Sequence, residues 1–159
     1  MKAQGNAPVA VRWDRLRERH TCHSNCIQTV RNTLDKLGVN YSIIGRDEMH
    51  RGSLYDKDFV LTIGGDGTTL NVASFLDNHV PIAGINSDPA TISSDYRSNR
   101  SDERKSKGAL CAMTALDVED ILPKIIYGTF PAAHRTRIQC LVRSTYTETR
   151  LPPALNDLL

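Results

Sequence analysis

The sequence lacks the segments that direct a protein into or across a membrane. No apolar run approaches the roughly 18 residues of a membrane-spanning helix, and Met1 to Asn6 have no apolar centre of a secretion signal. The cytoplasm is therefore the expected compartment. The sequence also lacks a large excess of charge of either sign, because it contains 20 Lys and Arg and 18 Asp and Glu. A net charge of +2 favours neither nucleic acid nor a membrane surface as a partner.

Cysteine is scarce, with four residues at positions 22, 26, 111 and 140. We expect free thiols, because an intracellular chain of this length is usually reduced. His20 and His23 flank Cys22 and raise a metal site as an alternative. Zinc sites normally combine two well-separated ligand pairs, and no second pair is present. Both histidines also fall on an apolar stripe with helical spacing, so we predict no metal ligands.

The remaining composition is that of one globular domain, with 40% hydrophobic and 24% charged residues. We predict a loose tail over residues 1–10 and a helix over 11–37 that Gly38 ends. A continuous helix of that length would run about 40 Å, so we expect a break at 21–25. The other predicted elements are a strand at 41–44, a polar loop at 47–56, a mobile basic loop at 98–107, a helix at 116–127 kinked at Pro123, and strands at 137–143 and 145–149.

Two short runs predict strands that are buried on both faces. Residues 58–63 and 80–85 are rich in apolar and β-branched side chains, which is typical of parallel sheets. Residues 69–77 between them have helical spacing. Strand, helix and strand in this order form a βαβ unit. The fold class predicted is α/β, with an open, mainly parallel, doubly wound sheet.

A glycine-rich turn follows the first of these strands. Gly64, Gly65 and Gly67 permit a turn that other residues would make only with strain, and let the backbone approach a ligand closely. Backbone N–H groups there, and at the helix that follows, suit phosphate oxygens, and ligands of open α/β sheets bind at the carboxyl ends of strands.

Asp66 is the unusual member of this turn. A phosphate would repel its carboxylate unless Asp66 orients a hydroxyl, accepts its proton or meets a cation, and all three roles belong to phosphoryl transfer. The dinucleotide fingerprint Gly-x-Gly-x-x-Gly and the P-loop are both absent. The structural alternative is a tight turn in which Asp66 caps the helix.

The turn also carries a family resemblance. Ile63-Gly64-Gly65-Asp66-Gly67-Thr68 resembles the GGDGT signature of NAD kinases and diacylglycerol-type lipid kinases. Residues 80–86, a strand ending in Gly-x-Asn, resemble the second NAD kinase segment, and residues 154–157 (Ala-Leu-Asn-Asp) resemble that family's Asn-Glu/Asp motif. Asn-Ser-Asp-Pro at 86–89 and residues 108–112 most resemble the plant-type NADH kinase branch. The Gly-x-Leu-Gly-Phe continuation of most NAD kinases is absent, so no adenine-stacking residue is assigned.

The resemblance implies a kinase that uses ATP and Mg²⁺ to phosphorylate the adenosine-ribose 2′-hydroxyl of NAD or NADH. It makes Asp66 the catalytic residue. It assigns phosphate and nucleotide contacts to Gly64, Gly65, Gly67, Thr68, Asn86, Asn156 and Asp157. For Asn86 the alternative is a turn residue. Mg²⁺ would arrive mainly on the ATP phosphates, because it keeps its waters and needs few protein ligands.

The resemblance also predicts an incomplete chain. Family members have a strand before the first helix and a β-rich second domain, so residues 11–159 would be most of an N-terminal α/β domain, and the full-length protein a homodimer. The apolar end of the chain indicates a cut. Two alternatives stay open: a nucleotide-binding fragment without turnover, and a lipid kinase with the same glycine turn.

Overall fold

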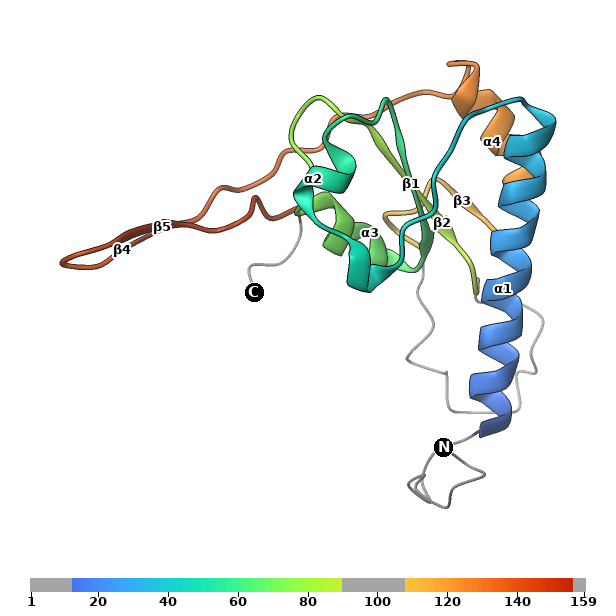
Figure 1. Ribbon diagram of the computed structural model, residues 1–159, viewed down its shortest axis with the longest axis horizontal. Coiled ribbons are helices and arrows are strands. Elements are labelled where there is room, and N and C mark those ends of the chain that lie inside the picture. Colours follow the sequence, from blue (N-terminus) through green and yellow to red (C-terminus); the bar gives the residue numbers. More distant parts are fainter. Residues whose placement is uncertain (1–12, 90–107, 156–159) are drawn as a thin grey trace.

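The computed structural model describes residues 13–89 and 108–155 of the chain (Figure 1). The predicted tail at 1–10 and basic loop at 98–107 lie outside the described residues. No helix in the described part is long and apolar enough to cross a membrane. The elements, in chain order, are α1 (Trp13–Lys36), η2 (Arg46–Glu48), α2 (Arg51–Leu54), β1 (Val60–Gly64), α3 (Asp66–Ala73), β2 (Ile82–Asn86), β3 (Met113–Thr114), α4 (Val118–Ile126), β4 (Leu141–Arg143) and β5 (Glu148–Arg150).

A parallel sheet with the order β1-β2-β3 forms the centre of the fold. β1 and β2 pair from Val60 with Ile82 through to Gly64 with Asn86, and β3 joins β2 by pairing Met113 with Ile85. The βαβ unit β1–α3–β2 is confirmed, and both strands start two residues later than predicted. Ile85 is fully buried, as expected for a strand covered on both faces.

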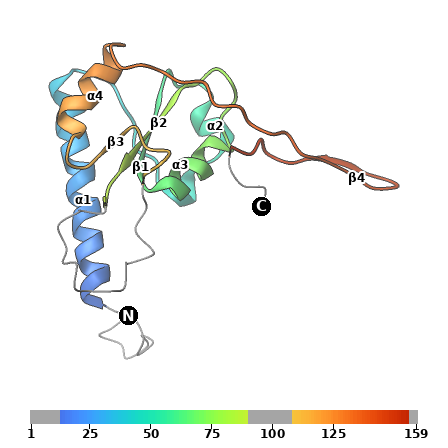
Figure 2. The same cartoon turned by 180° about the vertical axis from the view of Figure 1, so that it is seen from behind.

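Helices cover both faces of this sheet (Figures 1 and 2). On one face α1 and α4 pack against each other and against the strands around a cluster of Cys26, Val30, Leu34, Ala83, Ile85, Met113, Val118 and Leu122. On the other face α3 and the end of α2 enclose Leu54, Val60, Val72 and Leu76. This arrangement confirms the predicted open α/β architecture. Because the carboxyl ends of all three strands meet at one edge, residues after β1 and β2 come together there.

Helix α1 is continuous over 24 residues, so the predicted break at 21–25 was wrong. That segment contains neither Gly nor Pro, and the Thr21 hydroxyl donates back to the Arg17 carbonyl at 2.9 Å, which is compatible with a helix. Of the predicted apolar stripe, Val30 and Leu34 are buried, whereas Leu16 is half exposed. A helix of this length spans about 36 Å. It therefore extends past the sheet core toward the carboxyl edge, and Gly38, with φ of +66°, ends it as predicted.

The connection from α1 to β1 differs from the sequence prediction. Residues 41–44 form no strand, because no segment among the described residues pairs with them, and Ile44 instead packs on the second core cluster. The segment predicted as a polar loop contains the short helices η2 and α2. Burial of Leu54 at the end of α2 accounts for this order, since a single anchored side chain is enough to hold one helical turn against the sheet.

Helix α4 follows β3 and is slightly shorter than predicted. It contains Pro123, and Gly128, with φ of +70°, lies just past its end. Beyond it, β4 and β5 form an antiparallel ribbon, with Leu141 paired to Arg150; both strands are shorter than the strands predicted at 137–143 and 145–149. The ribbon projects from the body of the molecule in both views (Figures 1 and 2). All of its strand residues are exposed.

Candidate functional site

The glycine-rich turn connects β1 to α3 without left-handed backbone. Gly65 is the N-cap residue of α3 with extended φ and ψ of −106° and −171°. The positive-φ glycines of the described chain lie elsewhere, at 38, 108 and 128. The sequence prediction that the turn needs glycine for its backbone angles was therefore wrong.

Two glycines of the turn differ in what surrounds them. At Gly64 a Cβ would clash with the Thr68 side chain, so the fold itself requires glycine there. At Gly67 a Cβ would meet nothing within 4 Å. Packing within the described chain therefore gives no reason for a glycine at 67, in the first turn of α3. Close approach of a ligand would give one.

Asp66, the first residue of α3, is held by backbone from a distant segment. Its Oδ1 accepts the Leu110 N–H at 2.8 Å, and its Oδ2 accepts the Ala109 N–H at 3.1 Å. The carboxylate also lies at the positive end of the α3 dipole, where negative charge is stabilised. The N-cap residue of α3 is Gly65, with no side-chain cap hydrogen bond. The two Asp66 oxygens instead join α3 to the segment that leads into β3.

The end of β2 forms the other side of this edge. Asn86 and Ser87 are buried, the Ser87 N–H donates to the Gly64 carbonyl at 3.1 Å, and the Asn86 Oδ1 accepts the Asp88 N–H at 3.3 Å. Asn86 thus has the turn role that the sequence left open, and its nucleotide contact stays a prediction. From α1, His23 hydrogen-bonds the Ser87 hydroxyl at 2.9 Å, and Arg19 pairs with Asp88 at 3.5 Å.

Thr68 and Thr69 have different positions beside this turn. The Thr68 N–H donates to the Gly65 carbonyl at 3.0 Å, so this amide is used within the helix cap. Its side chain is exposed. Thr69 is buried, and its hydroxyl bonds the Thr62 hydroxyl at 2.9 Å. Of the first-turn amides, Gly67 is one that helix geometry leaves without an intrahelical acceptor.

The cysteines have no common site. Cys26 lies in the core, Cys22, one helical turn earlier on α1, is exposed, and His23 faces Ser87. Among residues 13–89 and 108–155, no three His, Cys, Asp or Glu side chains are grouped to hold a metal ion. Cys111 Sγ lies 3.9 Å from the Asp66 Oδ1. Burial raises the pKa of the Cys111 thiol, the Thr69 hydrogen bond opposes this, and the Asp66 charge adds to it, so the thiol stays protonated near neutral pH.

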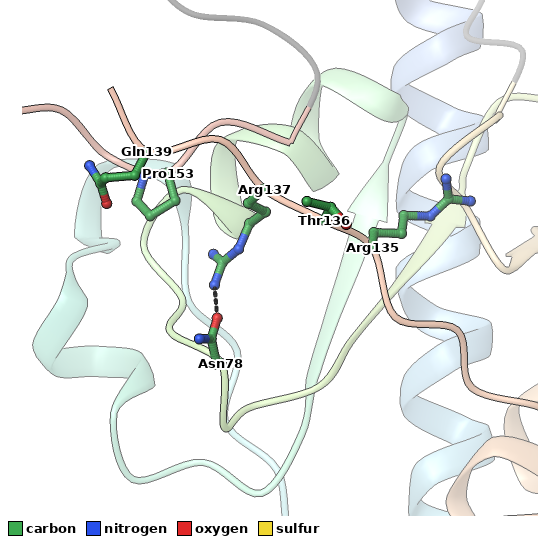
Figure 3. A pocket seen from close by; sticks show the side chains of 6 residues that line it. All are labelled: Asn78, Arg135, Thr136, Arg137, Gln139 and Pro153. Atoms are coloured by element: carbon green, nitrogen blue, oxygen red, sulfur yellow. Dashed lines mark hydrogen bonds between the residues drawn. The ribbon is translucent and has the colours of Figure 1, made fainter. Parts of the chain in front are cut away.

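A cavity of about 360 Å³ lies at the opposite end of α3 (Figure 3). It is lined by Asn78, Arg135, Thr136, Arg137, Gln139 and Pro153. The Arg137 guanidinium donates to the Ala73, Leu76 and Asp77 carbonyls and to the Asn78 Oδ1 at 2.7–3.0 Å. It therefore caps the C-terminal end of α3 and fastens the start of the projecting ribbon there. An α-helix of eight residues is about 12 Å long, so this cavity is separate from Asp66.

The structure thus brings six of the eight predicted site residues to one edge: Gly64, Gly65, Asp66, Gly67, Thr68 and Asn86. Asn156 and Asp157 lie outside the described residues. Sequence reasoning missed the Ala109 and Leu110 amides, and also His23 and Ser87. Backbone amides leave no trace in residue identity, and the helical spacing assigned His23 to the apolar stripe of α1. Only the left-handed Gly108 beside Ala109 offered a signal, which the sequence alone does not distinguish from an ordinary turn.

Comparison with known proteins is consistent with this arrangement. Residues 15–104 match the family described as the ATP-NAD kinase N-terminal domain. The chain is 37% identical to the NADH kinase of Arabidopsis thaliana over 130 residues, which are 81% of this chain and 41% of that protein. It is 32% identical to a probable NADH kinase of Oryza sativa subsp. japonica over 145 residues, 91% of this chain and 43% of that protein.

A human protein, the mitochondrial NAD kinase 2, is 29% identical over 133 residues, 82% of this chain and 27% of that protein. The chain therefore spans about two fifths of the length of its plant relatives and less of the human one. The family match covers both strands of the βαβ unit, the glycine-rich turn and Asp66. The chain belongs to the NAD kinase family.

Proposed function

We propose that this chain carries the phosphoryl-transfer site of an NAD(H) kinase, which uses ATP to phosphorylate the adenosine-ribose 2′-hydroxyl of NAD or NADH. The observation that carries the proposal is the position of Asp66: it begins α3 directly after a glycine-rich turn at the carboxyl edge of a parallel sheet. Both the family membership and the names of the plant relatives support the substrate class.

The reaction assigns a separate task to each part of the turn. The ribose oxygen forms a bond to the γ-phosphorus of ATP while the bond from that phosphorus to its bridging oxygen breaks, which gives NADP(H) and ADP. Asp66 accepts the hydrogen bond of the 2′-hydroxyl, orients the oxygen and receives its proton. A positioned general base typically contributes about 10²–10⁴-fold in rate.

The glycine side of the turn holds phosphate. The Gly67 N–H lies in the first turn of α3, where the helix dipole favours anions, and a Cβ at this position would meet no described atom within 4 Å. The exposed Thr68 hydroxyl is a second donor on the same turn. These groups stabilise phosphate charge while the reacting atoms are held in line, which is most of what catalysis of phosphoryl transfer requires.

Three further assignments belong to the proposal. Asn86, Asn156 and Asp157 contact the nucleotide, with the Asp157 carboxylate suited to ribose hydroxyls. Mg²⁺, when bound, neutralises phosphate charge and is carried mainly by ATP, since it needs few protein ligands. The assembly of the whole protein is a homodimer.

The test measures ADP release by the purified chain with ATP and Mg²⁺, run in parallel with NAD, NADH and diacylglycerol as acceptors, and identifies the phosphorylated product of each. Product from NAD or NADH alone supports the proposal. Phosphorylated diacylglycerol refutes the substrate class. Thermal stabilisation by NADH without product would replace the proposal with nucleotide binding alone.

A further inference from the structure

A segment of four residues packs on Asp66 and has no assigned role. Residues 108–111 connect to β3, and the consecutive amides of Ala109 and Leu110 each donate to a different oxygen of the Asp66 carboxylate, at 3.1 and 2.8 Å. Rotation of the carboxylate about its own axis would break both hydrogen bonds at once. The two donors therefore fix the plane of the carboxylate as well as its position.

The segment is itself firmly attached to the end of β2. The Cys111 N–H closes a turn on the Gly108 carbonyl at 3.0 Å, and the Ala112 N–H donates to the Gly84 carbonyl at 2.8 Å. Gly84 leaves space for this attachment, since a Cβ there would lie 3.1 Å from the Cys111 Cα. The amides that hold Asp66 are therefore fixed to β2, the central strand of the sheet.

Two features of the structure require glycine at position 108, the first residue of the segment 108–111. Its φ of +69° is left-handed, and a Cβ there would lie 2.9 Å from the Asn86 Nδ2 and 3.3 Å from the Asn86 Cβ. Asn86 is buried and engaged in its own turn, so it has little room to withdraw. A side chain at 108 would therefore move the segment, and with it the two amides.

We propose that residues 108–110 are a positioning element of the kinase site, which orients the Asp66 carboxylate toward the acceptor hydroxyl. This inference rests on the proposed function. A carboxylate has about four lone-pair sites, and the Ala109 and Leu110 amides each occupy one of them, on different oxygens. Preset orientation of a reacting group is a large source of rate, and a displacement of about 1 Å can cost roughly 100-fold.

The contact between residues 108–110 and Asp66 has two opposite interpretations, which a variant that loosens this segment distinguishes. If residues 108–110 blocked Asp66, loosening them would raise turnover. If they position Asp66, loosening them lowers turnover, while substrate affinity, set by other contacts, stays nearly constant. The sign of the change in kcat therefore decides between the two.

The chain offers matched controls for Gly108→Ala. Gly38 and Gly128 have φ of +66° and +70°, and a Cβ at either would meet nothing within 4 Å. Gly38→Ala and Gly128→Ala therefore introduce the same backbone strain without touching Asn86 or Asp66. We expect all three variants to lose stability, and only Gly108→Ala to lose kcat, by about 10- to 100-fold, with KM for both nucleotides within about twofold of wild type. A kcat equal to that of the controls, or higher than wild type, overturns the proposal.

A second measurement needs no turnover and no variant at 108. The amide proton shifts of Ala109 and Leu110 are followed by NMR as pH falls, in wild type and in Asp66→Asn. We expect both to follow protonation of Asp66 in wild type and neither to do so in the variant, while the Ala112 amide stays constant. Independence of both amides from pH in wild type overturns the proposal. A folded wild type with this titration but no kinase activity refutes the proposed function and the catalytic role together, and leaves the contact established.

Discussion

Gly67→Ala should raise stability and lower activity at the same time. Gly67 lies in the first turn of α3, has no left-handed φ, and a Cβ there would meet nothing within 4 Å. Replacing a helical glycine with alanine removes backbone freedom from the unfolded chain, which stabilises by about 0.5–1 kcal/mol. For a chain of this size that corresponds to roughly 1–4 °C in Tm.

The expected loss of activity follows from the open space beside Gly67, which we assign to a phosphate. If the Gly67 N–H binds a phosphate oxygen, the added methyl group lies beside that contact and displaces it. A hydrogen bond to a charged group contributes about 1.5–3 kcal/mol, so kcat/KM should fall by roughly 10- to 150-fold. Changes of opposite sign separate this outcome from simple damage to the fold.

Gly84→Ala is the contrasting variant. A Cβ at Gly84 would lie 2.6 Å from the Thr69 Oγ1 and 3.1 Å from the Cys111 Cα. It should lower Tm, since overpacking costs about 1–3 kcal/mol. The measurements are differential scanning calorimetry and a coupled NADP(H) assay. A Gly67→Ala chain that is more stable and keeps kcat/KM within twofold would refute the reasoning that this glycine marks the approach of a ligand.

Three further predictions follow from single contacts. Asp66→Asn replaces one acceptor with an NH₂ group that faces the Ala109 or Leu110 amide, so chemical denaturation should show a loss of about 1–3 kcal/mol; an unchanged stability would contradict the contact. Arg137→Ala removes the guanidinium donor from the Ala73 carbonyl at the end of α3 and from the Leu76 and Asp77 carbonyls after it, and the free energy of unfolding should fall by about 2–3 kcal/mol. Arg137→Lys should restore less than half of this loss, because lysine lacks the planar fork. Burial raises the pKa of the Cys26 thiol from 9.0 to about 11, so its contribution to stability is complete below pH 9 and falls as pH rises to 11. Urea denaturation between pH 9 and pH 11 should show a free energy of unfolding that falls with pH in wild type and does not fall for this reason in Cys26→Ala. The same pH dependence in both proteins would contradict the contribution of the buried thiol.

The strands β1 and β2 of the central sheet were predictable from sequence, because burial on both faces demands apolar, β-branched residues such as Val60 and Ile85. The two-residue strand β3 was not predicted. The ends of α1 and α4 were predictable because Gly38 and Gly128 mark left-handed ends. The strand predicted at 41–44 was wrong for a related reason: local propensity does not reveal whether a neighbouring strand is available.

The candidate site was predictable only where side-chain identity carries the chemistry. Asp66 in a glycine-rich turn is visible in the sequence. Its contact with Ala109 and Leu110 joins residues more than 40 positions apart through backbone amides, which every residue except proline possesses. The sequence also did not reveal why the turn contains glycines. A left-handed backbone, a clash with a neighbouring side chain and the close approach of a ligand each favour glycine, and residue identity does not distinguish them.

The most direct measurement of the central claim is the initial rate of NADP(H) formation by wild type and by Asp66→Asn, with ATP, Mg²⁺ and NADH, on chains shown to be folded. We expect product from wild type and a rate at least about 100-fold lower in the variant, the loss expected on removing a general base. A variant that forms product at the wild-type rate would contradict the role of Asp66. A folded wild type that forms none would contradict the proposed function of the chain.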